Sequence, residues 1–181
     1  MIESNHAPVV RLSRDSDVRR IADIYAYYVL HSPASFEVVP PDQTEIARRR
    51  AMVRKCGLPH LVAEVEGAVV GYAYASPHRA RAAYRYTLED SVYVDQAQTR
   101  NGIGRLLLAE LITASERAGY RQMVAVVGDS ANAASIGLHE RLGFRRIGLM
   151  PAVGFKFGRW VDTVLLQRPL GAADSSPPAD T

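Results

Sequence analysis

The feature that most constrains the fold of this chain is a glycine-containing loop between an apolar strand and a long helix. Residues 86–94 are rich in β-forming side chains, and after a polar stretch Gly102 and Gly104 open a segment, 104–118, with helical apolar spacing. Glycines let the backbone approach an anion closely, and the free N–H groups and the dipole of the first helical turn attract negative charge. The segment therefore predicts a strand–loop–helix phosphate site.

Two other kinds of phosphate loop do not fit this sequence. The pattern Gly-x-x-x-x-Gly-Lys-Ser/Thr does not occur, and the position three after Gly104, where a dinucleotide fingerprint has its third glycine, holds Leu107. A Gly-x-Gly pair also occurs in tight turns that bind nothing. Its place after a strand and at the start of a long helix favours the binding interpretation.

Hydrophobic periodicity and turn residues predict the element order β-α-α-β-β-β-α-β-α-β-β. This order predicts an α/β (α+β) fold with a mixed sheet, because it has too few βαβ units for a doubly wound domain. The run 122–127 is so apolar that we expect it to be a central strand. The expected strands cover 8–12, 61–66, 69–75, 86–94, 122–127, 144–149 and 161–167, and the expected helices about 18–29, 44–55, 104–118 and 131–142.

The length of 181 residues suits one domain with a real core, which we place over 1–170. The remaining segment, 171–181, is small, polar and proline-containing, and predicts a disordered tail. No apolar run approaches the roughly 18 residues of a membrane span. The first six residues show no basic region leading into an apolar stretch, so we expect a cytoplasmic protein without a signal peptide.

Charge and cysteine content exclude several classes of function. The net charge of +3, from 22 basic and 19 acidic residues, is too small to indicate a nucleic-acid partner. Cys56 is the single cysteine, which excludes an internal disulfide and a cysteine-rich metal site, and we expect no metal.

The loop resembles the acetyl-CoA motif of the GNAT acetyltransferases, Gln/Arg-x-x-Gly-x-Gly/Ala, with the departure that Thr99 stands at the first position. The second half supports this resemblance: Asn132, Ser135 and the stretch 138–144, Leu-His-Glu-Arg-Leu-Gly-Phe, are similar to the family's Asn, Ser/Ala and Leu-Tyr-Glu-x-x-Gly-Phe positions. The resemblance covers about 8–168. It implies a GNAT-like mixed, mostly antiparallel central sheet flanked by helices, and acetyl-CoA as co-substrate.

The resemblance also implies which residues hold acetyl-CoA. The family's contacts at this loop are mainly backbone amides, so Thr99 leaves the loop functional and puts one side-chain contact in doubt. The backbone N–H of Val94 resembles the donor that polarises the acetyl carbonyl. The implied cofactor residues are Val92, Tyr93, Val94, Arg100, Asn101, Gly102, Ile103, Gly104, Arg105, Asn132 and Ser135.

Three stretches resemble the phosphinothricin and methionine sulfoximine N-acetyltransferase branch of that family: 83–94, 139–144 and 154–162. Members of this branch acetylate the α-amino group of small glutamate-like amino acids. Members of this branch form homodimers, so the resemblance implies a homodimer here.

Two residues match catalytic positions of the family. Glu89 matches its general base, which takes a proton from the amine directly or through water; the alternative is a half-exposed strand carboxylate. His139 stands where many members have a tyrosine acting as general acid, and an imidazole can protonate the leaving thiolate or carry the amine proton. The alternative for His139 is structural packing at a helix end.

The acceptor's carboxylate and its phosphinate or sulfoximine oxygen need cationic or hydrogen-bonding partners. Arg79 and Arg85 lie between the predicted hairpin and the Glu89 strand, and guanidinium groups suit bidentate carboxylate recognition. Ordinary solvated arginines are the alternative. We assign Tyr86 to the same site, Phe36 to its apolar wall, and Lys156 to its completion, from the same or the neighbouring subunit.

The resemblance implies direct acetyl transfer in a ternary complex. An acyl-enzyme on Cys56 is disfavoured, because no recognisable motif places a histidine beside it. Two other functions stay open: acetylation of a protein N-terminus or another small amine, and non-catalytic sensing of acetyl-CoA.

Overall fold

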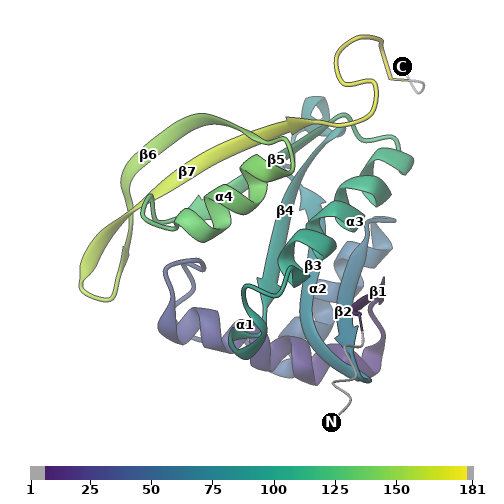
Figure 1. Ribbon diagram of the computed structural model, residues 1–181. Coiled ribbons are helices and arrows are strands. Elements are labelled where there is room, and N and C mark those ends of the chain that lie inside the picture. Colours follow the sequence, from purple (N-terminus) through teal and green to yellow (C-terminus); the bar gives the residue numbers. More distant parts are fainter. Residues whose placement is uncertain (1–6, 179–181) are drawn as a thin grey trace.

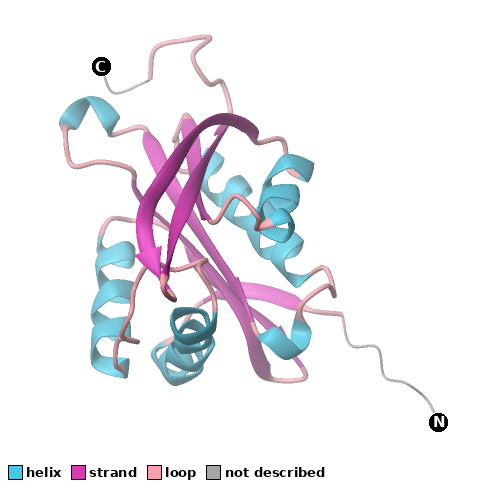
Figure 2. Cartoon of the chain, turned by 90° about the vertical axis from the view of Figure 1, so that its left-hand side faces the viewer, coloured by secondary structure: helices cyan, strands magenta, loops and turns pink. Residues whose placement is uncertain are grey.

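The computed structural model describes residues 7–178 and contains one seven-stranded sheet with helices on both faces (Figures 1 and 2). The strand order is β1-β2-β3-β4-β5-β7-β6, and only the β4–β5 pair is parallel. The mixed, mostly antiparallel sheet is confirmed. The strands are β1 Val9–Leu12, β2 His60–Val65, β3 Ala68–Pro77, β4 Thr87–Val94, β5 Gln122–Gly128, β6 Arg145–Lys156 and β7 Arg159–Pro169.

Four α-helices cover the sheet: α1 Val18–His31, α2 Gln43–Lys55, α3 Ile103–Arg117 and α4 Ala133–Arg141. Three short 3-10 helices connect them: η1 Asp15–Asp17, η2 Ala82–Tyr84 and η3 Gln96–Gln98. Each predicted helix is present, with its ends shifted by few residues. The predicted central strand is β5, which lies between β4 and β7.

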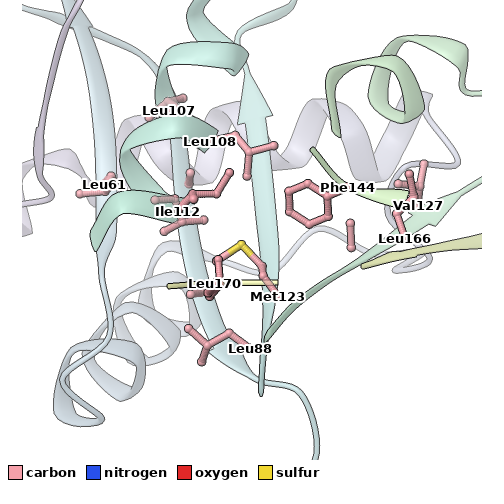
Figure 3. Packing of buried hydrophobic residues seen from close by; sticks show 14 of the residues in the cluster. Leu61, Leu88, Leu107, Leu108, Ile112, Met123, Val127, Phe144, Leu166 and Leu170 are labelled. Carbon is pink, nitrogen blue, oxygen red and sulfur yellow. The ribbon is translucent and has the colours of Figure 1, made fainter. Parts of the chain in front are cut away.

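The alternation of side chains along β2 explains the two layers. Leu61 and Ala63 belong to the larger core under α3, whereas Val62 belongs to the smaller core under α1 and α2. In the larger core, the apolar stripe of α3 packs on strands β2, β3 and β4; Figure 3 shows Leu107 and Ile112 in this core. This packing holds the start of α3 over the end of β4, where the functional cleft opens.

The hairpin of β6 and β7 is longer than the sequence pattern predicts. The expected strands left 150–160 unassigned, but β6 continues to Lys156 and β7 begins at Arg159. Register shifts interrupt the β6–β7 pairing between Arg146 and Gly148 and between Met150 and Gly154, so the period-2 signal is lost there. Because β6 is an edge strand, Pro151 costs no ladder hydrogen bond inside the sheet.

The segment after β7, predicted to belong to a disordered tail, forms turns over 171–174, and Arg121 donates to the carbonyls of Ala173 and Pro177. Disorder over the full range 171–181 stays a prediction. Residues 1–6, where the sequence shows no leader pattern, and 179–181 lie outside the described residues. Across 7–178, no helix has the length and apolar character to traverse a bilayer.

Candidate active site

A cleft of about 1330 Å³ opens where β4 and β5 separate. The two strands pair only from Thr87 opposite Gln122 to Glu89 opposite Val124, although β4 continues to Val94 and β5 to Gly128. Residues 89–94 of β4 and 125–128 of β5 line the resulting gap, together with the starts of α3 and α4. The cleft thus passes between the strands and connects the two faces of the sheet.

The backbone of β4 presents hydrogen-bond donors to this cleft. Asp95 donates its N–H to Val70 of β3, and Thr87 accepts from His78, so odd-numbered positions of β4 bond to β3. Alternation then turns the N–H groups of Val92 and Val94 toward the gap. The carbonyl of Val94 accepts a hydrogen bond of 2.6 Å from the Tyr28 hydroxyl, which also lines the cleft.

The start of α3 forms the expected anion cradle. Gly102 caps the helix with φ of 78°, a left-handed conformation that favours glycine. The first intrahelical bond runs from Leu106 N–H to the Gly102 carbonyl, which leaves the N–H groups of 103–105 without a helical acceptor. The side chains of Arg100 and Arg105 line the cleft beside these amides. Such a cradle suits a pyrophosphate.

The structure brings most predicted cofactor residues together. Asn132 caps α4 by accepting from the N–H of Ser135 at 3.2 Å. Two predicted residues lie apart from the cleft lining: Ile103 is 2% exposed within the larger core, and Asn101 is exposed and bonds to Gln98. The predicted cofactor residues that line the cleft are Val92, Tyr93, Val94, Arg100, Gly102, Gly104, Arg105, Asn132 and Ser135.

Glu89 lies at the point where β4 and β5 separate, and its side chain is 35% exposed. Burial raises the pKa of its carboxyl group, while a long contact of 3.4 Å with Nδ1 of His78 acts in the opposite direction. His78 was missed by sequence reasoning, because it follows a proline at the end of β3 and belongs to no motif. A partly desolvated carboxylate at the opening is suited to accepting a proton.

His139 is buried and engaged on both ring nitrogens. Nδ1 lies 2.7 Å from the Ser135 carbonyl, and Nε2 lies 2.9 Å from Oδ2 of Asp90. Burial lowers the pKa of His139, but the hydrogen bond and charge of Asp90 outweigh it, and the net shift is upward. The carboxylate of Asp90 and the carbonyl of Ser135 thus favour the protonated form of the ring. Both residues line the cleft, and Asp90 was also missed by sequence reasoning.

On the α1 side, the cleft is closed by the segment 32–37 between α1 and α2, which we call the acceptor loop. It contains Phe36, the predicted apolar wall. Lys156 does not line the cleft: it is 5% exposed, and its ammonium group donates to the carbonyls of Ser32 and Ser35 of the same subunit.

The other predicted acceptor residues also lie outside the cleft lining. Arg79 is exposed, with its Nε 3.4 Å from Nε2 of His78. Arg85 stacks on the ring of Tyr86, with 4.7 Å from its guanidinium carbon to the ring centroid. Arg79 is thus linked to Glu89 through His78, whereas Arg85 and Tyr86 pair with each other.

In the described part of the chain, no group of three or more histidine, cysteine, aspartate or glutamate side chains gathers in a way that would hold a metal ion. The cleft instead offers amide donors, the arginines beside the cradle and the partly exposed carboxylate of Glu89. These groups fit the pyrophosphate and thioester of acetyl-CoA and an amine acceptor.

Comparison with known proteins agrees with this geometry. Residues 21–144 match the acetyltransferase (GNAT) family. The chain is 54% identical over 172 residues to the phosphinothricin N-acetyltransferase of Alcaligenes faecalis, which covers 95% of this chain and 87% of that protein. It is 40% identical over 158 residues to the L-methionine sulfoximine/L-methionine sulfone acetyltransferase of Salmonella typhimurium, which covers 87% of this chain and 92% of that protein.

The fold also matches that of a relative of known structure. The phosphinothricin acetyltransferase of Sinorhizobium meliloti, crystallised in complex with acetyl-CoA, superposes with a TM-score of 0.93 at 44% identity, covering 96% of this chain and 94% of that chain. The chain therefore belongs to the GNAT acetyltransferase family, within its branch of phosphinothricin and methionine sulfoximine acetyltransferases.

Proposed function

We propose that this acetyltransferase moves the acetyl group of acetyl-CoA to the α-amino group of small glutamate-like amino acids, such as L-phosphinothricin and L-methionine sulfoximine or sulfone. The observation that carries the proposal is the cleft between β4 and β5. It connects the amide cradle of α3 with Glu89 and the acceptor loop on the other side of the sheet. Both substrates can therefore meet in one ternary complex, and transfer is direct.

The residues of this chain have separate tasks in the reaction. When bound, acetyl-CoA supplies the acetyl thioester. The N–H groups of Val92 and Val94 point into the gap, where a donor polarises the thioester carbonyl. Glu89 accepts the proton of the attacking amine, and burial raises its pKa toward the range in which a carboxylate is an effective base.

His139 as the general acid remains a prediction, and the structure sets a condition on it. Its two ring nitrogens face the Ser135 carbonyl and Asp90. To protonate a thiolate, the ring must give up one of these two bonds. Until then, the pair holds α4 against β4 at the wall of the cleft.

We assign recognition of the acceptor carboxylate first to Arg79, because its contact with His78 places it next to Glu89. Phe36 forms the apolar wall. Arg85 and Tyr86, which contact each other, remain candidates for the same site. Arg81, which is exposed and lies two residues away from Arg79, is a matched control for substitutions of these arginines.

The decisive experiment is a CoA-release assay with a panel of amines. We expect turnover with L-phosphinothricin and L-methionine sulfoximine, and little with peptides that expose a free N-terminus. Release of CoA with a peptide but with neither amino acid would favour protein N-terminal acetylation. Binding of acetyl-CoA without release by any amine would identify a sensor instead.

We further propose that the protein is a homodimer that associates through the β6–β7 hairpin. This hairpin carries a concentration of exposed apolar side chains that a monomer would leave in water: Ile147, Leu149, Val153, Phe155 and Trp160 are each more than half exposed. No nucleic-acid or membrane partner is expected, and a cytoplasmic location is a prediction from the sequence.

A further inference from the structure

We propose that Lys156 positions the acceptor side of the cleft. From the end of β6 its ammonium group binds the acceptor loop, residues 32–37, so the binding of the amino acid depends on the β6–β7 hairpin. Lys156 acts through the loop and does not touch the substrate. This inference rests on the proposed function, because it names the acceptor side of that site.

Lys156 is a buried cation whose ammonium group is hydrogen-bonded to two backbone carbonyls. It is the only buried residue of β6, at 5% exposure. Its Nζ donates to the carbonyl of Ser32 at 2.9 Å and to that of Ser35 at 2.5 Å, and it lies 4.9 Å from the centroid of the Phe157 ring. Burying an ammonium group is costly unless its donors are satisfied. The arrangement therefore persists only while the loop keeps both carbonyls in place.

The segment that Lys156 holds is a wall of the cleft. All six residues 32–37 line it, and they lie between the end of α1 and the start of α2 rather than in a regular element. The hydroxyl of Tyr25 fixes the same segment from α1, at 2.8 Å from the hydroxyl of Ser35 and 2.8 Å from Glu37. Without Lys156, the loop would lose its contact with the hairpin's cation but keep its contacts with α1.

The hairpin and the loop also fit together sterically. A Cβ atom at Gly154, two residues before Lys156, would lie 2.3 Å from Cε2 of Phe36. A Cβ atom at Gly128 of β5 would lie 2.2 Å from the carbonyl oxygen of Pro33. Both distances are far below a van der Waals contact, so the loop can sit here only because glycine stands at both places. Phe36 is thus placed by the hairpin.

The charges around Lys156 agree with a positioning role. Burial lowers the pKa of its ammonium group, while the charge of Glu37 at the end of the loop raises it. Glu37 itself pairs with Arg49 of α2 at 2.6 Å. The loop is therefore held between cations of two elements, one of which belongs to the exposed hairpin.

The test compares Lys156→Met with Lys55→Met. Lys55 and Lys156 are the two lysines of the chain, and Lys55 is exposed at the end of α2. For Lys156→Met we expect the KM for the amino acid to rise by about tenfold. The KM for acetyl-CoA and the kcat at saturating amino acid should stay within about threefold. Lys55→Met should match the wild type. Comparable rises in both KM values together with a fall in kcat would indicate a general disturbance of the site and overturn the proposal. An unchanged KM for the amino acid would also overturn it.

A second measurement does not depend on turnover, so it separates this inference from the proposed function. Amide hydrogen exchange of the acetyl-CoA-bound protein should rise in 32–37 in Lys156→Met and stay unchanged in the α3 start at 103–105. Unchanged exchange in 32–37 would overturn the inference even if the enzyme acetylates amino acids. A rise there would support it even if the substrate proves to be another amine.

A double-mutant cycle tests the steric half of the argument. Gly154→Ala should raise the KM for the amino acid, because the added methyl group displaces Phe36. In a Phe36→Ala background the same change should have little further effect, since the obstructing ring is gone. Additive effects of the two substitutions would show that Gly154 does not act through Phe36.

Discussion

The carboxylate of Asp90 and the imidazole of His139 form a buried pair, with 2.9 Å between Oδ2 and Nε2 and side chains that are 2% and 5% exposed. The pair joins β4 to α4 at the wall of the cleft. Because a carbonyl oxygen can only accept, the contact of 2.7 Å between Nδ1 and the Ser135 carbonyl requires a hydrogen on Nδ1. His139 therefore faces Asp90 with its second nitrogen and has no free position toward the substrates.

This pair makes the stability of the enzyme depend on pH in a defined direction. The folded-state pKa of His139 is raised, so the folded protein binds more protons than the unfolded chain between about pH 6.5 and that raised value. The stabilisation is complete below about pH 6.5 and is lost as the pH rises through the folded pKa. Removing the carboxylate abolishes this contribution.

We expect Asp90→Asn to lower the free energy of unfolding by about 3 kcal/mol at pH 6, because it leaves a buried ring without its ionic partner. The difference from the wild type should shrink between pH 6 and pH 9. Urea unfolding at several pH values measures it. A difference that does not change with pH would contradict an ionised pair.

Glu89→Gln should lower kcat by about 10²–10⁴-fold, the usual contribution of a general base. The side chain keeps its size, so the KM for acetyl-CoA should remain close to that of the wild type. Glu110→Gln, on the same helix that forms the cradle but facing away, serves as the control, since Glu110 is exposed and outside the cleft lining. Wild-type kcat in Glu89→Gln would exclude the base role.

The pH profile should report the neighbours of Glu89. Activity requires the carboxylate form, so kcat/KM should rise with pH through a pKa above the ordinary glutamate value of about 4.3. His78 lowers that pKa through its contact with the carboxyl group, so His78→Gln should move the rising limb to higher pH. A limb that shifts to lower pH, or that does not shift, would mean that another group controls it.

Gly102→Ala should weaken acetyl-CoA binding by about tenfold, because alanine resists a φ of 78° and turns the amides of the cradle. Gly119, at the opposite end of α3, has a φ of 85° and lies outside the cleft lining. Gly119→Ala should therefore lose a similar stability, about 1 kcal/mol, without losing affinity. Titration calorimetry with acetyl-CoA distinguishes the two variants. Equal affinities of the two variants for acetyl-CoA would show that the Gly102 loop does not bind the pyrophosphate.

Trp160→Glu should convert the proposed dimer to a monomer, because a charge in an apolar interface is left without solvation. Trp160 is 64% exposed and contacts Phe155 across the hairpin, with 5.3 Å between ring centroids. Val39→Glu is the control, since Val39 is 74% exposed but lies outside the hairpin. Sedimentation velocity gives the mass of each; a wild-type monomer would refute the dimer proposal.

Local sequence patterns predict much of this fold. The order of strands and helices follows from periods of 2 and 3.6 residues, and the cradle follows from two glycines between a strand and a helix, because these signals need only neighbouring residues. Over 150–160 the apolar residues show no clear alternation, so the sequence did not predict the full length of β6 and β7. The family resemblance added Glu89, His139 and acetyl-CoA, and the comparisons confirm the family.

Only the tertiary structure decided which side chains share the cleft. It paired His139 with Asp90, 49 positions earlier, and seated Lys156 on carbonyls 121 and 124 positions away. It also brought His78 to Glu89, and left Arg85 and Tyr86 outside the lining. These contacts depend on where β4 separates from β5 and how the hairpin crosses the acceptor loop. Strand separation and loop seating result from packing across the whole domain, so no local pattern encodes them.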